Sequence, residues 1–403
     1  MANEKTLSRR GLLAAAPMAA ASALLPKPSE TAKDAPPLPA PFPPDAFRER
    51  QERLRAALKA AGLDAALLVP STNLEYVGNL ETHRSERLMA LVVRPGAPST
   101  FITPSFEEER VRRDAVASEV LTWREEEDPI RLLARVLKGA SKIGVEGSTD
   151  YHTVARLVDA TGVKAVDSSP LFDSLRSVKN ERERALIADA AARTERAIAA
   201  THRRLAEGMT ERQIAELLES EFKRQLVRGG GLVQIGPSSA LPHGGPGDAV
   251  LRSGSVLLID CGCRVRGYTS DITRTVVFGR PSDEMVRVYA AVDAAQRAAL
   301  AAFRAGAIPE LVDRAARGVI EKAGWGAFFT HRVGHGLGMD GHETPYLVGG
   351  NKRPLVAGNV CTLEPGIYLP GKFGVRIEDD FAAKEGGAEP LSTRPTELLT
   401  IAS

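Results

Sequence analysis

The sequence predicts a two-domain protein of the α/β class, and three observations lead to this prediction. The chain has 403 residues, of which 43% are apolar, enough to form more than one core. Short apolar strand patterns alternate with amphipathic helix patterns between residues 45 and 175, as in a sheet covered by helices. Longer helix patterns and strand pairs that meet at glycine turns then fill residues 176–403. We therefore expect one domain at 45–175 and a second at 176–403.

Residues 1–25 have the pattern of a targeting segment. The twin arginines Arg9 and Arg10 precede an alanine-rich apolar run that ends at Leu25, and residues 21–23 offer small side chains at cleavage spacing. We interpret this as a bacterial twin-arginine export signal and expect a periplasmic or extracellular protein. The alternative is a disordered or anchoring N-terminus, although the apolar run is too short to span a bilayer comfortably.

Residues 26–44 predict a linker, because they contain eight prolines in nineteen residues. Such a composition is typical of a semi-rigid, poorly ordered segment. Net charge adds little, since the formal total is +2 and the first 25 residues already carry +2 (three basic, one acidic), which leaves 2 − 2 = 0. The remainder of the chain has no basic footprint for nucleic acid, and we expect neither nucleic acid nor membrane as a partner.

The first domain alternates helices and strands. We expect helices at 47–61, 106–116, 129–137 and 151–160, and strands at 65–69, 88–93, 119–123 and 142–145.

The second domain begins with two amphipathic helices, at 180–209 and 211–225, with Thr210 as the N-cap of the second. A dimerising coiled coil is the alternative, but the pattern ends within about four heptads and shows no regular apolar seam. A strand at 232–235 and helices at 283–305 and 309–323 complete this prediction.

The stretch from residue 258 to 275 predicts a hairpin, because two strand-like runs meet there at a glycine turn. With the turn centred near Val265 and Arg266, Asp260 and Asp271 would lie almost opposite each other, with β-carbons about 5 Å apart. Facing carboxylates repel unless a cation lies between them.

A second hairpin would repeat this arrangement. A turn near Gly371 would bring Glu364 opposite Glu378, and between the two hairpins His335 has glycines on both sides, which allow close approach to a ligand. Four carboxylates and one imidazole form a ligand set for two divalent cations, whose charge would balance the −4 of the carboxylates.

Three cysteines, Cys261, Cys263 and Cys361, raise the alternative of a zinc site. On a strand, Cys261 and Cys263 would point to the face opposite Asp260, so they cannot join the same ligand set. We expect all three to be small buried hydrophobic residues, and their odd number argues against a disulfide framework.

These residues resemble the pita-bread-fold metallopeptidases, which include aminopeptidase P, prolidase, methionine aminopeptidase and the metal-free relative creatinase. The five metal ligands of that family correspond to Asp260, Asp271, His335, Glu364 and Glu378, separated by 11, 64, 29 and 14 residues. The likeness extends to the motifs at 334–338, 342–345, 364–366 and 376–379. The first domain resembles, less specifically, the N-terminal domain of the prolidase, aminopeptidase P and creatinase branch.

The resemblance implies a role for each ligand. Asp260 would chelate one metal ion, His335 and Glu364 the other, and Asp271 and Glu378 would bridge them. Such a pair of ions activates water and stabilises a developing oxyanion. Oxygen-rich sites of this kind accept Mn²⁺, which we expect here, or Co²⁺ or Zn²⁺.

Further site residues follow from the same resemblance. Glu364 would take the proton of the attacking water, while His243 and His342 would orient the substrate carbonyl as hydrogen-bond donors. Arg376, two residues from Glu378 on the same strand face, would hold a ligand carboxylate; the alternative is a surface ion pair. His83 and Arg87 lie in a polar loop that either is ordinary surface or reaches toward an active site, sometimes that of a neighbouring subunit.

The function implied by the resemblance is hydrolysis of the bond before proline in a peptide or dipeptide, by a homodimer that works as an Xaa-Pro aminopeptidase or an Xaa-Pro dipeptidase. Two alternatives remain: a creatinase-like amidinohydrolase and a non-enzymatic peptide-binding protein. The complete carboxylate set disfavours the first, and the second would be expected to lack a ligand.

Overall fold

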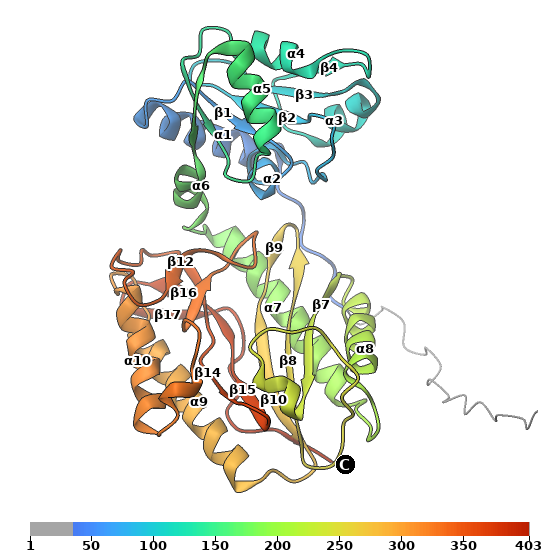
Figure 1. Cartoon of the computed structure of the whole chain (residues 1–403), viewed down its shortest axis with the longest axis vertical. Coiled ribbons are helices and arrows are strands. Elements are labelled where there is room, and N and C mark those ends of the chain that lie inside the picture. The colour runs from blue at the N-terminus through green and yellow to red at the C-terminus, as the bar shows by residue number, and fades with distance from the viewer. Residues whose placement is uncertain (1–34, 403) are drawn as a thin grey trace, which may run out of the picture. The chain divides into compact units, whose positions relative to one another are not determined.

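The computed structural model describes residues 35–402, and the predicted export signal lies outside this range. The first domain contains a six-stranded mixed sheet in the order β4-β3-β2-β1-β5-β6, shown at the blue-to-green end of the chain in Figure 1. Its strands are β1 (Ala65–Leu68), β2 (Ala90–Val93), β3 (Thr100–Pro104), β4 (Glu119–Trp123), β5 (Lys142–Val145) and β6 (Lys164–Asp167). Its helices are α1 (Pro44–Ala60), α2 (Thr72–Gly78), η1 (Ser105–Glu107, a 3₁₀ turn), α3 (Glu108–Asp114), α4 (Pro129–Val136), α5 (Tyr151–Thr161) and α6 (Ser169–Arg176).

Every element predicted for the first domain is present, and four further elements are not apparent in the sequence pattern. Strands β1, β2 and β3 are buried throughout, so β1 and β2 appear as apolar runs rather than alternating patterns. Strand β3 is short and ends at a proline, while α6 carries proline in its first turn. The elements α2, β3, β6 and α6 are too short for a periodicity argument.

Two five-stranded sheets, a two-stranded sheet and four long helices build the described part of the second domain. One sheet has the order β18-β10-β8-β7 with β9 attached to β8, another has the order β12-β11-β13-β16-β17, and β14 pairs with β15. The strands of the first sheet are β7 (Gly229–Ile235), β8 (Ser255–Val265), β9 (Tyr268–Thr269), β10 (Ile272–Phe278) and β18 (Thr400–Ile401). The others are β11 (Gly334–Gly336), β12 (Glu343–Leu347), β13 (Val360–Leu363), β14 (Gly366–Leu369), β15 (Phe373–Arg376), β16 (Asp379–Lys384) and β17 (Gly387–Pro390).

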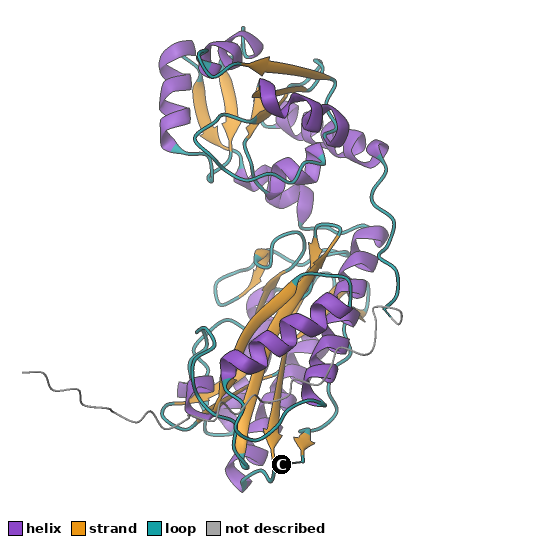
Figure 2. Cartoon of the chain, turned by 90° about the vertical axis from the view of Figure 1, so that its right-hand side faces the viewer, coloured by secondary structure: helices purple, strands orange, loops and turns teal. Residues whose placement is uncertain are grey.

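The long helices cover the two sheets separately. They are α7 (Glu181–His202), α8 (Glu211–Arg224), α9 (Asp283–Ala302) and α10 (Pro309–Lys322), with short 3₁₀ turns η2 (Gly236–Ala240) and η3 (Gly326–Phe328). Helices α7 and α8 lie along the strands of the first sheet, as Figures 1 and 2 show, and share an apolar core with β8 and β10. Helices α9 and α10 share a second core with β13, β14 and β15. The helix-free faces of the two sheets are thereby left to form a site.

Helix α7 is shorter than the sequence pattern predicts. It begins after Asn180, which caps it with a capping box, and ends at His202 rather than near 209. The chain leaves the helix after Arg203 and reaches Gly208 at φ +90°, a conformation that keeps the pattern up to residue 209 from being one continuous helix. Thr210 then caps α8 with a second capping box, which confirms the predicted N-cap.

The first hairpin has a different register from the predicted one. Its two-residue turn consists of Arg266 at φ +50° and Gly267 at φ +90°, both in the left-handed region that such a tight turn requires. The turn centre is therefore one residue later than expected, and Asp260 pairs with Thr273 instead of Asp271. Asp271 instead precedes β10, where its backbone N–H donates to an oxygen of Asp380 at 3.2 Å.

The second hairpin has the predicted register. Gly366 pairs with Arg376 in β14 and β15, and Leu363 pairs with Asp379 in β13 and β16. Both pairings keep the same register across the residues between them, which places Glu364 and Glu378 across from each other. The cysteine prediction is also confirmed, because all three thiols are free and buried.

The described part of the predicted linker, residues 35–43, is held against the second domain, so the expectation of poor order was wrong there. Proline lacks an N–H, and the carbonyls of a proline-rich segment therefore need donors from elsewhere. Three arginine side chains supply them. These hydrogen bonds join Arg193 to Pro36 and Pro37, Arg266 to Pro39, and Arg182 to Ala40 and Pro41.

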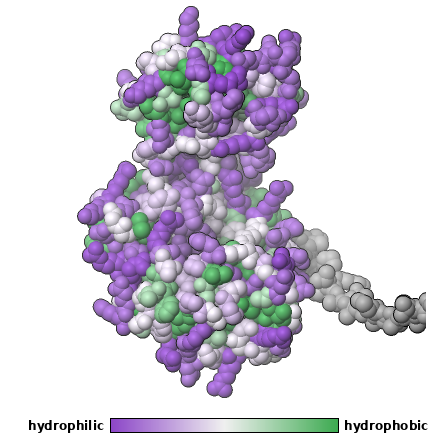
Figure 3. Space-filling view, in the orientation of Figure 1, coloured by the Kyte–Doolittle hydropathy of each residue, from purple (hydrophilic) through white to green (hydrophobic). Residues whose placement is uncertain are grey.

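One face of the protein is mainly polar. Figure 3 shows hydrophilic residues over much of this face, with hydrophobic residues in scattered groups. Within residues 35–402, no helix combines the length and the apolar character needed to cross a bilayer.

The close approach of β7 to β8 generates a stability prediction. A β-carbon on Gly231 would lie 2.0 Å from the backbone oxygen of Asp260, whereas one on Gly230 would meet nothing nearer than 3.7 Å. We expect Gly231→Ala to lower the free energy of unfolding by about 1–3 kcal/mol, the usual range for overpacking, and Gly230→Ala to change it little. Thermal and urea unfolding of both variants would check this; equal stabilities would contradict the described strand packing.

Candidate metal centre

The eight predicted site residues line a single cavity of about 570 Å³ in the second domain. Three of them lie in strands (β8, β11 and β15) and the others in the segments between elements, and more than a hundred residues separate the first from the last in the sequence. The lining residues are Pro242, His243, Asp260, Asp271, His331, Arg332, His335, His342, Val348, Glu364, Arg376 and Glu378.

Two groups of predicted ligands share one carboxylate. Oxygens of Asp260, Asp271 and Glu378 lie within 4.8 Å of one another, and so do ligand atoms of His335, Glu364 and Glu378. The first sheet supplies Asp260 and Asp271, and the second part of the domain supplies the rest. Because Glu378 belongs to both groups, the arrangement has room for two neighbouring ions with Glu378 between them.

The His335 imidazole is oriented to offer a nitrogen to this cluster. Its Nδ1–H donates to the backbone oxygen of Gly336 at 3.0 Å, which leaves the Nε2 lone pair facing Glu364 at 3.3 Å and Asp271 at 3.8 Å. Burial lowers the pKa of His335 to about 3, so the ring is neutral, the form that binds metal ions. Gly336 and Gly334 permit this tight placement, because a β-carbon on either would lie within 2.4 Å of a backbone oxygen.

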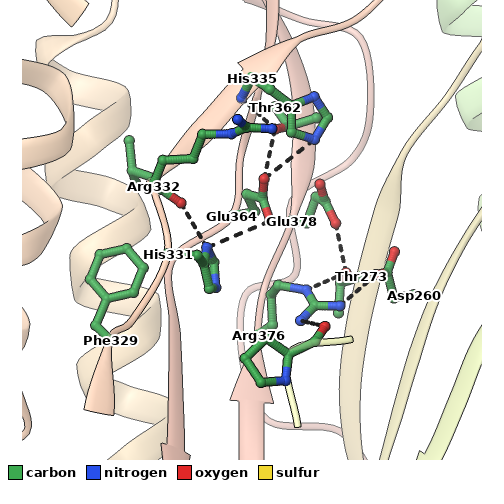
Figure 4. Close-up of polar contacts among 12 residues, drawn as sticks. Asp260, Thr273, Phe329, His331, Arg332, His335, Thr362, Glu364, Arg376 and Glu378 are labelled. Carbon is green, nitrogen blue, oxygen red and sulfur yellow. Dashed lines mark hydrogen bonds and ion pairs between the residues drawn. The ribbon is translucent and has the colours of Figure 1, made fainter. Parts of the chain in front are cut away.

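Arg376 and Thr273 hold two of the carboxylates in place, as Figure 4 shows. The Arg376 guanidinium is 3% exposed and donates to Asp260, to Thr273 Oγ1 at 3.0 Å and to the Tyr368 hydroxyl at 2.8 Å. Thr273 Oγ1 in turn donates to Glu378 at 2.7 Å. The alternative of a surface ion pair for Arg376 is therefore wrong. Its N–H groups donate to protein acceptors, and these hydrogen bonds orient Asp260 directly and Glu378 through Thr273.

The electrostatics of the cluster fit divalent cations. Burial and the neighbouring carboxylates raise the pKa values of Asp271 and Glu378, and burial raises the pKa of Glu364 to about 7. These shifts mean that the ionised carboxylates repel one another in a desolvated site. Hard or borderline divalent cations prefer oxygen and imidazole ligands of this kind and would balance their charge. The donor set thus fits two ions held by Asp260, Asp271, His335, Glu364 and Glu378.

Two predicted substrate histidines lie at the cavity wall. The His342 ring is 3.9 Å from the His335 ring, centroid to centroid, and its Nδ1 faces an Nη2–H of Arg332 at 3.3 Å. Since a guanidinium only donates, Nδ1 accepts, and the proton of neutral His342 lies on Nε2. Burial and Arg332 lower the pKa of His342. His342 therefore offers an Nε2–H donor, while His243 is an exposed residue of the loop after η2.

Some residues of the site were missed by the sequence argument. Thr273 was missed because the predicted turn was placed one residue too early. The correct register places Thr273 opposite Asp260. His331 Nε2 lies 2.7 Å from the Tyr368 hydroxyl, and its Nδ1 lies 2.7 Å from the Arg332 carbonyl; burial lowers the pKa of His331 to about 4. Its position four residues before His335 gave no periodic signal. Asp380 is fully buried and accepts a hydrogen bond from the backbone N–H of Asp271; the sequence argument did not single it out.

His83 and Arg87 remain outside this cavity. Arg87 is partly exposed, contacts Glu125 and Glu86, and its guanidinium carbon lies 5.6 Å from the ring centre of Phe106. His83 is exposed in the same loop. Within the described chain they are surface residues of the first domain.

The fold and the cluster together define a metallopeptidase of the pita-bread type. A model of metallopeptidase family M24 matches residues 185–385, and a model of the creatinase/prolidase N-terminal domain matches residues 50–178. The chain belongs to metallopeptidase family M24, and the predicted fold class of two α/β domains is confirmed.

Several known proteins resemble the chain over nearly its whole length. It is 35% identical over 369 residues to the probable dipeptidase PepE of Mycobacterium bovis, covering 89% of this chain and 98% of that protein. The crystal structure of dipeptidase PepE from Mycobacterium ulcerans matches with a TM-score of 0.85 and 35% identity, over 90% of this chain and 100% of the other. An Xaa-Pro dipeptidase from Bacillus anthracis matches with a TM-score of 0.82 and 31% identity, over 88% and 99%.

The hydroxyl of Thr273 generates a prediction about metal binding. Thr273→Val removes both the hydrogen bond to Glu378 and the acceptor of Arg376 Nε while nearly preserving the volume. We expect metal affinity to fall about 10- to 100-fold, as is usual when a residue that orients a ligand is lost. Thr273→Ser keeps the hydroxyl and should retain most of the affinity. Titration of chelator-treated protein with Mn²⁺ would measure both; equal affinities of the two variants would contradict the role of the hydroxyl.

Proposed function

We propose that this metallopeptidase hydrolyses the bond before proline with the help of two divalent metal ions. One observation carries the proposal: a cavity brings together four carboxylates and a neutral imidazole whose ligand atoms lie within a few ångströms of one another. The spacing of these residues in the chain and the likeness to an Xaa-Pro dipeptidase support the same conclusion. Mn²⁺ is the proposed metal, with Co²⁺ and Zn²⁺ as alternatives.

The residues of this chain each have a part in the reaction. Divalent ions bound here would supply an activated water and positive charge beside the reacting carbonyl. Glu364, a carboxylate of the cluster that lines the cavity, would accept the proton of that water and release it later. His342 and His243 both line the cavity, and we propose that each donates a hydrogen bond to the oxygen of the substrate carbonyl. Arg376 keeps Asp260 oriented throughout.

The chemistry of the bond explains why proline can be accepted by this site. The nitrogen of the cleaved Xaa-Pro bond belongs to a tertiary amide without an N–H, so an enzyme cannot grip it there by a hydrogen bond. The site described here acts on the carbonyl side and places proton carriers nearby, and it needs no such N–H. Proline-containing peptides or dipeptides are therefore the proposed substrates. A homodimer, implied by the same resemblance, is part of the proposal and would be refuted by light scattering that finds only monomers.

Two other functions have less support from the observations. A creatinase-like amidinohydrolase would work without metal, yet the present cluster keeps all five ligands. A peptide-binding protein without activity would be expected to have lost part of this set. Either would be revealed by the experiment that follows.

The direct test is a substrate comparison. Chelator-treated protein reloaded with Mn²⁺ should hydrolyse Xaa-Pro dipeptides and leave matched Xaa-Ala dipeptides and creatine unchanged. Asp271→Ala should lose bound metal and several orders of magnitude of turnover, whereas His243→Ala should keep its metal and lose about 10²–10³-fold, the usual effect of deleting one oxyanion donor. Product analysis and metal analysis would be made on each variant. A fully loaded protein that cleaves no Xaa-Pro bond would refute the proposed function.

We further propose that the protein is exported by the twin-arginine pathway and works in the periplasm or outside the cell. Arg9 and Arg10 before an apolar run support this proposal. Replacing both arginines by lysine should leave the precursor in the cytoplasm of the producing bacterium, as fractionation and immunoblotting would show. Unchanged export of that variant would refute the pathway.

A further inference from the structure

Glu211 is a buried carboxylate that binds both ends of the loop that carries His243. It is the first residue of α8 and is 2% exposed. Its Oε1 accepts hydrogen bonds from the Ser238 hydroxyl and from the Ile235 N–H, the second at 2.7 Å. Its Oε2 accepts from the Gly247 N–H at 2.6 Å. Because Ser238 precedes His243 by five residues and Gly247 follows it by four, one side chain joins the two ends of this loop.

The contacts of this carboxylate are close and charge-assisted. Hydrogen bonds to an ionised carboxylate are about twice as strong as those between neutral groups, and the N-terminus of a helix further stabilises a negative charge in its first turn. A β-carbon on Gly247 would lie 2.9 Å from Glu211 Oε2. Glycine at this position therefore lets the backbone N–H reach the carboxylate.

The loop has no regular structure that would fix His243 by itself. From the end of η2 to the start of β8 the chain forms neither a helix nor a strand, and His243 is exposed at the cavity wall. Before His243, side chains from outside the loop hold its backbone. Gln234 donates to the carbonyl of Leu241 at 3.1 Å, and Arg376 donates to that of Pro242 at 3.4 Å.

After His243, the start of α8 holds the chain. The N–H of Arg212 donates to the Gly247 carbonyl at 3.3 Å, and the N–H of Glu211 donates to the Ala249 carbonyl at 3.0 Å. These backbone hydrogen bonds attach one end of the loop to α8. The Glu211 carboxylate reaches the other end as well, so it sets the distance between the two ends and with it the position of the residues between them.

We propose that Glu211 is a positioning residue for the reaction, because it holds the loop so that His243 meets the oxygen of the substrate carbonyl. This inference rests on the proposed function, in which His243 donates to that oxygen. Glu211 is not among the residues that line the cavity, so it acts through the loop. A donor stabilises an oxyanion best when it is already in place as the charge develops, and a misplacement of about 1 Å can cost about 10²-fold in rate.

Glu211→Gln is the main test, because it keeps the size of the side chain and changes its hydrogen bonding. An amide has one acceptor oxygen and one NH₂ donor. In either orientation its NH₂ therefore faces a backbone N–H, that of Ile235 or that of Gly247, and one end of the loop is released. We expect kcat on an Xaa-Pro dipeptide to fall about 10- to 100-fold. KM and bound Mn²⁺ should change little, since the loss concerns the transition state.

The same substitution made together with His243→Ala separates positioning from a general defect of the fold. Without the imidazole, Glu211→Gln should cause no further loss, so the double variant should have the kcat of His243→Ala alone. A general defect would lower kcat by the same factor with and without His243. Asp248→Asn is the matched control, because it makes the same change of carboxylate to amide in the same loop, at an exposed ion pair with Arg212. Its kcat should equal that of the unaltered protein.

Gly247→Ala perturbs the same contact from the loop and replaces Glu211→Gln in this comparison if that variant does not fold. Its effect on kcat should likewise disappear without His243. The inference is overturned if the losses from the two substitutions multiply, or if Glu211→Gln has the kcat of the unaltered protein. It is also overturned if His243→Ala leaves the cleavage of Xaa-Pro bonds unchanged. An unaltered, Mn²⁺-loaded protein that cleaves no Xaa-Pro bond would instead refute the proposed function.

Discussion

Mutual repulsion among four clustered carboxylates is the constraint on which the site depends. Asp260, Asp271, Glu364 and Glu378 converge on one cavity, and burial raises the pKa of three of them. Such a cluster is costly unless cations balance it. The protein opposes the repulsion in part with Arg376, yet that guanidinium lies beside the cluster and reaches Asp260 alone. Divalent cations would balance the remaining charge, and the oxygen and imidazole ligands present suit them.

The arrangement of the two five-stranded sheets in the second domain brings these carboxylates together. Helices α7 and α8 cover one sheet and α9 and α10 support the other, so the uncovered faces supply the ligands. Alternation along β8 places Cys261 in the core beside α7 while Asp260 points to the cavity. Glycines at 231, 334 and 336 allow strands to approach where a β-carbon would collide with a backbone oxygen. The same strands thus pack into the core with one face and supply cavity residues with the other.

The candidate metal ligands could be predicted from the sequence, because few other kinds of site would require these residue types at this spacing. The second hairpin was placed in its correct register, since Gly371 marks a turn with glycine at φ +72°. The first was placed one residue early, because the turn uses Arg266 at positive φ, a conformation that an arginine seldom adopts. The sequence analysis did not predict contacts between segments that are distant in the chain. The arginines that hold residues 35–43, and the approach of Arg332 to Tyr346, depend on tertiary packing that leaves no periodic signal.

The central claim is that the five residues hold two divalent ions side by side. Crystals grown with Mn²⁺ and measured at the manganese absorption edge would test it most directly. The account predicts two anomalous peaks about 3.5–4 Å apart, with Glu378 and Asp271 between them, Asp260 on one and His335 and Glu364 on the other. A single peak, or peaks that lie away from these five side chains, would contradict it.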